Sequence, residues 1–306
     1  DDKAGCECWE EAEGKLQEMA ANKALSKSGL EKKDIRYIVA GDLLGQLMAS
    51  SFGLMKLEIP MFGIYGACST MGESISIASM LVDGGYADNI LAITSSHFAS
   101  AEKQFRFPLG YGSQRKMAST WTVTGSGAVI ISSERMAQKA NMSDKNKVHI
   151  TGITTGKIVD FGVKDSMNMG ACMAPAAGNV IVQNLIDNGR KPEWYDKIIT
   201  GDLGLVGKDI LLDITRSKGY DIADRYMDCG IEIYSREQEI QAGGSGCGCS
   251  ASMLAGYIVK MLEKGTWQRV LFVPTGALLS PVSFNEGDSV PGIAHAVVFE
   301  CSGESQ

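Results

Sequence analysis

The sequence predicts an α/β fold built from two copies of one supersecondary unit. Short β-rich runs alternate with segments of helical length, which is typical of mostly parallel sheets. The run "YIVAGDL" at 37–43 is echoed by "KIITGDL" at 197–203, and residues 68–94 align with residues 249–275 without a gap. Because the two echoes occur in the same order, they indicate an internal duplication.

The first copy opens with a helix at Trp9–Ser28, in which Glu and Lys are spaced for helical contacts and Gly29 is the expected stop. Apolar residues share one side of this helix: Leu16, Met19, Ala20 and Leu25. The remaining elements expected in this copy are strand Tyr37–Ala40, helix Leu44–Lys56, strand Phe62–Tyr65, helix Ser69–Asp83, strand Ile90–Thr94 and strand Ala128–Ser132.

The second copy repeats this order. Its expected elements are strand Val148–Thr154, helix Ala176–Asn188, strand Lys197–Thr200, helix Asp209–Lys218, helix Ser250–Lys264, strand Val270–Pro274 and strand Ala294–Glu300. Its opening strand has no counterpart before Trp9, and the chain begins without Met, so we expect a preceding segment that carries this strand. The predicted divisions are an N-terminal half at 1–133, a polar linker at 134–147 and a C-terminal half at 148–306.

Composition narrows the class of protein. The net charge of the 306 residues is -7, which argues against nucleic acid as a partner. No apolar run approaches the roughly 20 residues that span a bilayer, and no signal segment opens the chain, so we expect a soluble protein. The eight cysteines are expected as reduced thiols. Their two C-x-C pairs, at 6–8 and 247–249, lack a nearby His, so no metal site is predicted.

Cys68 is the first candidate site residue. It ends an apolar run just before the helix at 69–83, whose N-terminus would favour an anion. We therefore expect Cys68 and the adjacent Ser69 to line a pocket, although most free cysteines are simply small buried hydrophobes. Cys247 and Cys249 lie in a Gly-rich turn of the second copy, and we expect them to face the same crevice or to be buried in the core.

A long connection at 95–116 carries the second set of candidates. It combines the cations His97, Lys103, Arg106, Arg115 and Lys116 with the aromatic residues Phe98, Phe105, Phe107 and Tyr111. It follows a strand's C-terminal end, where ligands bind in open α/β sheets, and Arg is well suited to carboxylates. We assign His97 to the site and Arg115 and Lys116 to the surface. For Lys103 and Arg106 a site role and a solvated loop or dimer contact stay open.

Three further residues complete the candidates. Asp42 and Asp202 end equivalent strands, where we expect them to cap a turn or helix or to orient His97 or Lys103. His295 lies in the last apolar strand, where a hydrogen-bonded core histidine is the preferred interpretation. The residues that the sequence offers for ligand binding are thus Asp42, Cys68, Ser69, His97, Lys103, Arg106, Asp202, Cys247, Cys249 and His295.

Several long motifs carry a resemblance to a known family. They include "AGDLLGQ", "GIYGACST", "SSHFASAEKQFRFPLGYGSQ", "TWTVTGSGA", "MAPAA", "GGSGCGCSA", "TGALLSP" and "IAHAV". Together with two βαβαβαββ copies and a Cys at the first elbow, they resemble the thiolase-like superfamily and, within it, the stage V sporulation protein AD family of spore-forming Firmicutes. The resemblance implies a thiolase-like fold, with the two halves stacked in five layers, α-β-α-β-α.

The resemblance also implies a function. Members of this family bind dipicolinic acid, act with membrane proteins of the same transport system and help to load dipicolinate into the developing spore. It implies a homodimer that meets through the strand at 59–67, and a place in the spore as a soluble protein at the inner membrane. No cofactor is implied, and whether calcium accompanies the ligand stays open.

The superfamily's enzymes need a His that this sequence lacks at the expected positions, which read Gly201-Asp202 and Ser245–Ser250. No His occurs between His149 and His295. A carboxylate does not replace an imidazole as a proton shuttle in this chemistry. We therefore expect a non-enzymatic binding protein. The alternatives are an acyl-transfer enzyme that uses Cys68 with His97 or His295 as base, and a structural scaffold whose crevice is filled by side chains.

Overall fold

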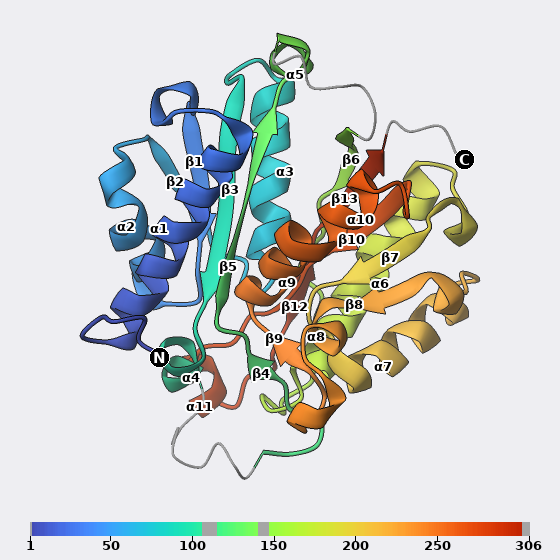
Figure 1. The fold of residues 1–306 in the computed structure, drawn as a ribbon. Helices are drawn as coiled ribbons and strands as arrows, with labels where there is room; N and C mark the ends of the chain where they lie inside the picture. Colours follow the sequence, from blue (N-terminus) through green and yellow to red (C-terminus); the bar gives the residue numbers. More distant parts are fainter. Residues whose placement is uncertain (1, 106–114, 140–146, 302–306) are drawn as a thin grey trace.

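Two large β-sheets and three layers of helices make up most of the structure, a computed structural model that describes residues 2–105, 115–139 and 147–301. The first sheet has the strand order β2-β1-β3-β5, and the second has the order β6-β13-β10-β7-β8. Figure 1 shows the two sheets side by side with helices between them and outside them. All strands of the first sheet come from the first half of the chain, and all strands of the second come from the second half.

In the first sheet, β1 (Tyr37–Gly41) lies between β2 (Met61–Gly63) and β3 (Asn89–Ser96), and both neighbours are parallel to it. β5 (Gly125–Ser132) pairs with β3 in the antiparallel direction. Every residue of β3 is buried, as expected for a strand covered on both faces. β2 forms an edge of the sheet.

The second sheet repeats this arrangement. β7 (Lys197–Thr200) lies between β8 (Tyr226–Asp228) and β10 (Arg269–Val273) in parallel pairing, and β13 (Ala296–Cys301) is antiparallel to β10. β6 (Val148–Thr154) extends the sheet beyond β13, and no described residue supplies its counterpart in the first sheet. β1 and β7 therefore occupy equivalent central positions, and both end next to a Gly-Asp pair.

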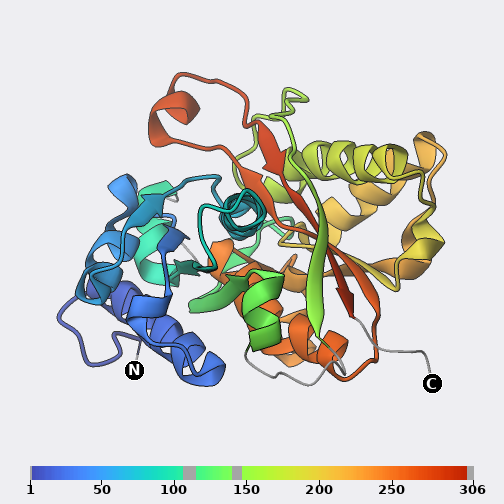
Figure 2. The same cartoon turned by 90° about the horizontal axis from the view of Figure 1, so that it is seen from above.

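The helices form the other three layers. α1 (Trp9–Ser28) and α2 (Met48–Leu54) cover the outer face of the first sheet, and α6 (Met169–Asp187) and α7 (Gly204–Ser217) cover the outer face of the second. The central layer contains α3 (Thr70–Asp83), α9 (Cys247–Met253) and α10 (Val259–Glu263). Figure 2 shows α3 end-on between the two halves. The order is α-β-α-β-α.

The remaining elements are short helices and strands outside the two large sheets. They are α4 (Phe98–Phe105), β4 (Trp121–Thr122), α5 (Glu134–Lys139), α8 (Cys229–Glu232), β9 (Gly244–Ser245), β11 (Thr275–Ala277), α11 (Pro281–Asn285) and β12 (Gly292–Ala294). A π-helical turn at Leu254–Ile258 joins α9 to α10. Two short 3-10 turns flank α2, at Gly45–Leu47 and Met55–Leu57.

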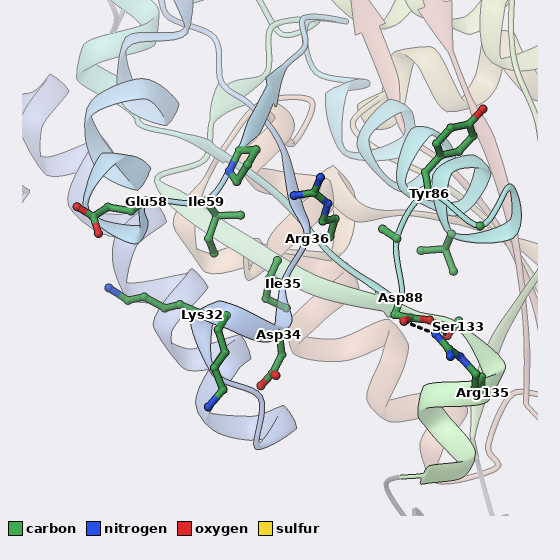
Figure 3. Close-up of a pocket in the computed structure, with 15 residues that line it drawn as sticks. Lys32, Asp34, Ile35, Arg36, Glu58, Ile59, Tyr86, Asp88, Ser133 and Arg135 are labelled. Carbon is green, nitrogen blue, oxygen red and sulfur yellow. Dashed lines mark hydrogen bonds and ion pairs between the residues drawn. The ribbon is translucent and has the colours of Figure 1, made fainter.

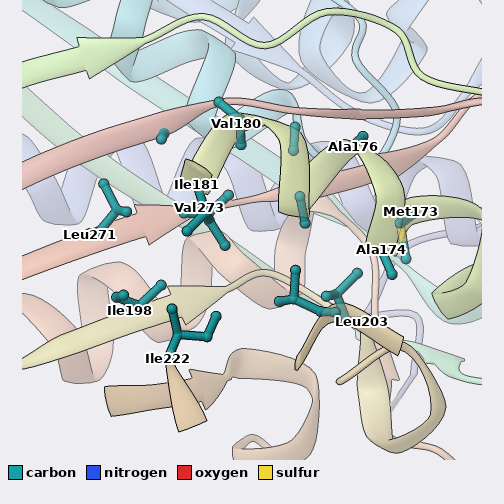
Figure 4. Close-up of a cluster of buried hydrophobic side chains, with 14 of the residues drawn as sticks. Met173, Ala174, Ala176, Val180, Ile181, Ile198, Leu203, Ile222, Leu271 and Val273 are labelled. Carbon is teal, nitrogen blue, oxygen red and sulfur yellow. The ribbon is translucent and has the colours of Figure 1, made fainter. Parts of the chain in front are cut away.

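Two large hydrophobic cores hold the layers together. One lies between the second sheet and its outer helices, where Met173, Val180 and Ile181 of α6 pack against Ile198 and Leu271 (Figure 4). The other fills the space between the two sheets around α3, α9 and α10. α6 is the one described helix that is long and apolar enough to cross a membrane, but 72% of that window is buried inside the protein. Its hydrophobicity serves the core.

The predicted elements are present, but several bounds differ: α7 begins at Gly204, five residues before the expected start, and the expected helix at 250–264 is divided by the π-helical turn. α6 begins at Met169, seven residues before the expected start, and accommodates Pro175 inside the helix. α5 occupies part of the segment expected to be a linker. The buried face of α1 is also not the predicted one, since Met19 is 57% exposed while the polar Glu13 and Gln17 are fully buried.

The close contact between α1 and α2 explains the polar face of α1. A Cβ atom at Gly53 would lie 2.3 Å from the Gly14 carbonyl oxygen, so the two backbones meet at glycines. At this spacing the Gln17 amide reaches through to donate to Ser50 Oγ of α2 (3.0 Å) and Ser95 Oγ of β3 (2.8 Å). Polar side chains of the outer layer thus reach the end of the first sheet.

Candidate functional site

A strained turn presents Cys68 at the start of α3. Ala67, the residue before it, has φ 50, in the left-handed region that non-glycine residues seldom adopt. Ser69 Oγ donates to the Gly66 carbonyl (2.7 Å) and stabilises the turn. Gly276 of β11 packs directly on it, since a Cβ at 276 would lie 3.2 Å from the Cys68 nitrogen and 3.0 Å from the Ser69 nitrogen. The sequence correctly placed Cys68 at a tight elbow.

Asp202 lies on the other side of the Cys68 thiol. It follows β7, and its carboxyl accepts hydrogen bonds from Thr275 Oγ1 (2.7 Å) and from the Gly246 backbone N–H (2.9 Å). After burial, the charge of this carboxyl is the next cause of the raised pKa of Cys68, which places the carboxyl close to the thiol. Asp202 does not orient His97 or Lys103, but through Gly246 it stabilises the turn before α9, a capping role of the kind expected. It also lies beside the candidate nucleophile.

Burial and mutual proximity determine the protonation states of the Cys68 thiol and the Asp202 carboxyl. Desolvation, followed by the charge of Asp202, raises the pKa of Cys68 well above its usual value. Desolvation raises the pKa of Asp202 from 3.8 to about 7, against the hydrogen bonds that lower it. At neutral pH the thiol is therefore uncharged, and the carboxyl is close to half protonated. A thiolate, which is the nucleophilic form, is disfavoured here.

Side chains fill the space in front of the thiol. Cys68 is only 7% exposed and belongs to a small cluster, here called the Cys68 cluster, that consists of Leu43, Cys68, Ala101, Phe105 and Cys247. Cys247 Sγ donates to the Ser95 carbonyl (2.9 Å). Cys249 instead packs in the core between the sheets and donates to the Gly201 carbonyl (3.6 Å). Of the two cysteines expected at the crevice, only Cys247 joins Cys68.

Neither candidate histidine pairs with Cys68. His97 is buried, its Nε2 donates to the Asp2 carbonyl (2.7 Å), and its Nδ1 accepts from the Ala99 N–H (3.2 Å). His295 is 5% exposed, and neither of its ring nitrogens has a hydrogen-bond partner. Desolvation lowers its pKa from 6.5 to about 4, so the ring is neutral. His295 is therefore in the core, as expected, but the expectation that its ring would be hydrogen-bonded was wrong.

The lysines and the arginine that were expected here and that the structure describes bind carboxylates of other elements. The Lys103 ammonium forms an ion pair with Glu10 of α1. Arg115, expected at the surface, has a buried side chain that pairs with Glu102 (2.7 Å) and stacks over the Trp121 ring at 4.1 Å. Lys116 is exposed and pairs with Asp165 (3.0 Å). Arg106 lies outside the described residues.

Buried carboxyl groups surround the Cys68 cluster. Asp42 is fully buried and accepts hydrogen bonds from the backbone N–H groups of Leu44 and Ser50 and from Ser50 Oγ. This is the capping role considered for Asp42. Glu13 of α1 is equally buried and accepts from Ser95 Oγ (2.9 Å) and Ser100 Oγ (2.6 Å). Desolvation raises the pKa of Glu13 from 4.5 to about 7. The charges that raise the pKa of Cys247 come from Glu13, Asp42 and Asp202, so the site is acidic.

Sequence reasoning missed three residues of this site. They are Glu13, Thr275 and Tyr65. Although 51% of Tyr65 is exposed, desolvation and the nearby Cys68, Cys247 and Asp42 raise its pKa to about 12, so its hydroxyl end lies toward the cluster. The echo between residues 68–94 and 249–275 ends at Thr94 and Thr275, a signal that could have drawn attention to Thr275.

Two open pockets lie away from Cys68. One, of about 660 Å³, is at the opposite end of the first sheet, between Lys32, Arg36, Tyr86 and the paired Asp88 and Arg135 (Figure 3). The other, of about 600 Å³, is lined by aromatic residues that include Phe98, Trp121 and Tyr234. Neither pocket includes Cys68. In the described part of the chain, no three His, Cys, Asp or Glu side chains are arranged to hold a metal ion.

Comparison with known proteins agrees with this architecture. 3-Oxoacyl-[acyl-carrier-protein] synthase III of Aquifex aeolicus VF5 superposes with a TM-score of 0.57 at 16% identity, covering 93% of this chain and 83% of that one. OleA of Xanthomonas campestris, solved with bound lauric acid and lauroyl-CoA, gives a TM-score of 0.61 at 13% identity, covering 93% and 82%. The predicted thiolase-like fold is confirmed, and these distant matches carry no more than the fold.

The sequence matches are much closer. The profile of the family described as Stage V sporulation protein AD matches residues 1–300. Stage V sporulation protein AD of Bacillus subtilis (strain 168) is 46% identical over 295 residues, which is 96% of this chain and 84% of that protein. A match of this extent, on a thiolase-like fold with a buried elbow cysteine, shows that the chain belongs to the stage V sporulation protein AD family.

Proposed function

We propose that this sporulation protein is a non-enzymatic binding protein for dipicolinate, with its ligand site at Cys68. The observation that carries the proposal is the burial of the Cys68 thiol beside the Asp202 carboxyl, in a cluster whose described members include no histidine. Acyl transfer needs a thiolate or a base that generates one. Here the neighbouring group is the Asp202 carboxyl, which raises the pKa of the thiol. Neither His97 nor His295 has a ring nitrogen hydrogen-bonded to the sulfur.

The same surroundings support an anion site of an unusual kind. The start of α3, a helix of 14 residues, places the positive end of the helix dipole at the turn at Cys68. The other polar groups there are neutral. They are the Cys68 thiol, the Cys247 thiol, which now donates to the Ser95 carbonyl, and the Thr275 hydroxyl, which now donates to Asp202. A dicarboxylate bound at this place requires Asp202 in its protonated form, which its pKa of about 7 permits.

Titration calorimetry with the purified protein tests the proposal. The ligands are dipicolinate and benzene-1,3-dicarboxylate, which keeps both carboxylates but lacks the ring nitrogen, each with and without calcium chloride. We expect dipicolinate to bind with one site per chain and more tightly than its analogue. Cys68→Ala should weaken binding through the shape of the pocket, while the control Cys301→Ala should not. Absence of dipicolinate binding under every condition would refute the proposal.

We also propose that the protein acts as a homodimer beside membrane proteins of the same spore transport system. Support for the dimer comes from the edge strand β2, whose three residues are all exposed, including Met61 and Phe62. Nearby exposed apolar residues extend this surface: Met48, Phe52, Met55 and Tyr65. An apolar edge strand of this kind suits pairing with a second copy. The membrane partners rest on the resemblance alone.

The second candidate function is acyl transfer with Cys68 as nucleophile. The strained elbow at Ala67 and the close approach of Gly276 to the backbone of Cys68 favour it, because such a turn suits a catalytic thiol. Incubation with short and long acyl-CoA, followed by peptide mass spectrometry, distinguishes the two functions. The binding proposal expects no acylated Cys68, whereas a stoichiometric thioester at Cys68 would establish the alternative.

A further inference from the structure

α4 covers the Cys68 thiol. Ala101 and Phe105 of this helix supply two of the five residues of the Cys68 cluster, and Ala101 is completely buried. On the other side, Leu43 closes the cluster from the segment after β1. In Figure 1, α4 lies at the lower end of the first sheet, where β3 ends and α3 begins. A ligand therefore reaches Cys68 only if α4 or the segment at 43–47 moves.

α4 is attached by polar and apolar contacts, which include the buried ion pair of Glu102 with Arg115 (2.7 Å) and the stacking of Phe98 on Trp121. Ser100 Oγ donates to Glu13 (2.6 Å), Gln104 Oε1 accepts from the Gly45 N–H (3.0 Å), and Lys103 pairs with Glu10. Glu102 accepts from Thr122 N (3.1 Å) and Thr122 Oγ1 (2.8 Å). Opening of α4 must break the buried Glu102–Arg115 pair, but it leaves in place the sheet beneath, whose strand β3 is buried over its whole length. A helix of eight residues can open in this way at a lower free energy than global unfolding.

The segment opposite α4 is strained. Gln46 and Leu47 have φ 57 and φ 55, so two consecutive non-glycine residues are in the left-handed region. Each such residue stores conformational energy that only its surroundings maintain. One of the contacts that hold this segment is the bond from Gly45 to Gln104 of α4. Release of α4 therefore also frees a segment that relaxes when its contacts are lost.

We infer that α4 is a movable cover that opens as a unit to admit ligand to the Cys68 site. Ser100 and Gln104 are its latches, meaning that their hydrogen bonds to Glu13 and Gly45 hold the cover closed. The inference rests on the proposed binding site at Cys68, but opening itself is a property of the free protein. Four buried cysteines make it measurable. Cys68 and Cys247 lie under α4, while Cys229 and Cys249 lie in the core between the sheets.

The test is pulse labelling of the folded protein with N-ethylmaleimide, read out at each cysteine by peptide mass spectrometry. We expect Cys68 and Cys247 to react at least about tenfold faster than Cys229 and Cys249. Ser100→Ala and Gln104→Ala should each raise the rates at Cys68 and Cys247 several-fold and leave those at Cys229 and Cys249 unchanged. The control Ser217→Ala removes an exposed hydrogen bond on α7 and should change none of them.

Equal labelling of all four cysteines, or latch variants that accelerate all four together, would overturn the inference, since the thiols would then react only through global unfolding. Dipicolinate binding is measured separately by calorimetry. Selective labelling without dipicolinate binding would support the movable cover and refute dipicolinate as the ligand. Dipicolinate binding with equal labelling of the four cysteines would support the ligand and refute the movable cover.

Discussion

The Asp202 carboxyl lies beside the buried Cys68 thiol, and this proximity acts on the pKa values of the two groups in opposite directions. It lowers the pKa of the carboxyl and raises that of the thiol. A catalytic cysteine requires the reverse, a neighbour that stabilises the thiolate. This proximity therefore favours a neutral thiol and a carboxyl that titrates near neutrality.

The first prediction concerns the pH dependence of ligand binding. A dicarboxylate binds next to Asp202 only when that group is neutral, so affinity should increase as the pH falls through about 7. Between pH 8 and pH 6 we expect a gain of roughly tenfold, since each pH unit above the pKa changes the neutral fraction by about that factor. Calorimetry across this range measures it.

The variant Asp202→Asn should bind about equally at pH 6 and pH 8, because its side chain does not titrate. The control Asp209→Asn, at an exposed position of α7, should keep the wild-type profile. A wild-type affinity that is constant with pH, or one that rises with pH, would show that Asp202 does not contact the ligand.

The second prediction concerns folding stability. The pKa of Glu13 is raised from 4.5 to about 7, so the folded protein holds this proton more tightly than the unfolded chain does. The contribution of Glu13 is fully present below about pH 4.5 and is lost as the pH rises through about 7, at a cost of about 3 kcal/mol. Urea unfolding from pH 4.5 to pH 8 measures it.

Glu13→Gln should be less stable than wild type at pH 5 by about 1 kcal/mol, because one serine loses its acceptor. At pH 8 the order should reverse, since wild type must then bury a charge. Glu18→Gln, on the same helix but partly exposed, should show a pH profile parallel to that of wild type. The absence of a crossover for Glu13→Gln would contradict the assignment.

The third prediction concerns the buried ion pair of Arg115 and Glu102, whose side chains are 2% and 0% exposed. Arg115→Met leaves the Glu102 carboxylate buried without its cation and should lower the free energy of unfolding by about 3–5 kcal/mol. The double variant Glu102→Gln, Arg115→Met should recover part of this loss. A single variant within about 1 kcal/mol of wild type would contradict a stabilising buried ion pair at this place.

The fourth prediction concerns the oligomeric state. Phe62→Lys places a charge on the exposed edge strand β2 and should convert the proposed dimer to a monomer in light scattering after size-exclusion chromatography. Leu205→Lys is the matched control, because Leu205 is 49% exposed on the outer layer of the other half. A wild-type monomer at micromolar concentration, or a dimer that tolerates Phe62→Lys, would exclude β2 as the contact.

Much of the fold could be predicted because it depends on local patterns. The β-rich runs, the helical segments and the duplicated Gly-Asp ends are visible in the sequence, and each matches an element of the structure. The elbow at Cys68 was also visible. The equivalent elbow in the second half was harder to identify, because the gapless echo aligns Cys68 with Cys249. In the structure it is Cys247 that follows a residue of positive φ, Gly246. The π-helical turn at Leu254–Ile258 alters the spacing between the copies.

The rest of the site depends on contacts between distant segments. Arg115 looked like a surface residue because nothing nearby in the sequence shows that Glu102 and Trp121 will enclose it. The lack of a partner for His295 is likewise a property of its packed neighbours. Glu13 and Gln17 look like residues of an exposed helical face, and they are buried only because α1 and α2 meet at Gly14 and Gly53.

The close packing of α1 on α2 at Gly14 and Gly53 limits which residues the outer helices can accept, because the position of the buried polar side chains depends on it. A single methyl group at Gly53 would collide with the α1 backbone and separate the two helices. The separation would draw Glu13 and Gln17 away from Ser95, which is also the carbonyl partner of Cys247. Substitutions tolerated elsewhere on α1 and α2 are thus excluded at Gly53, and relatives that keep the same buried polar groups should keep this glycine.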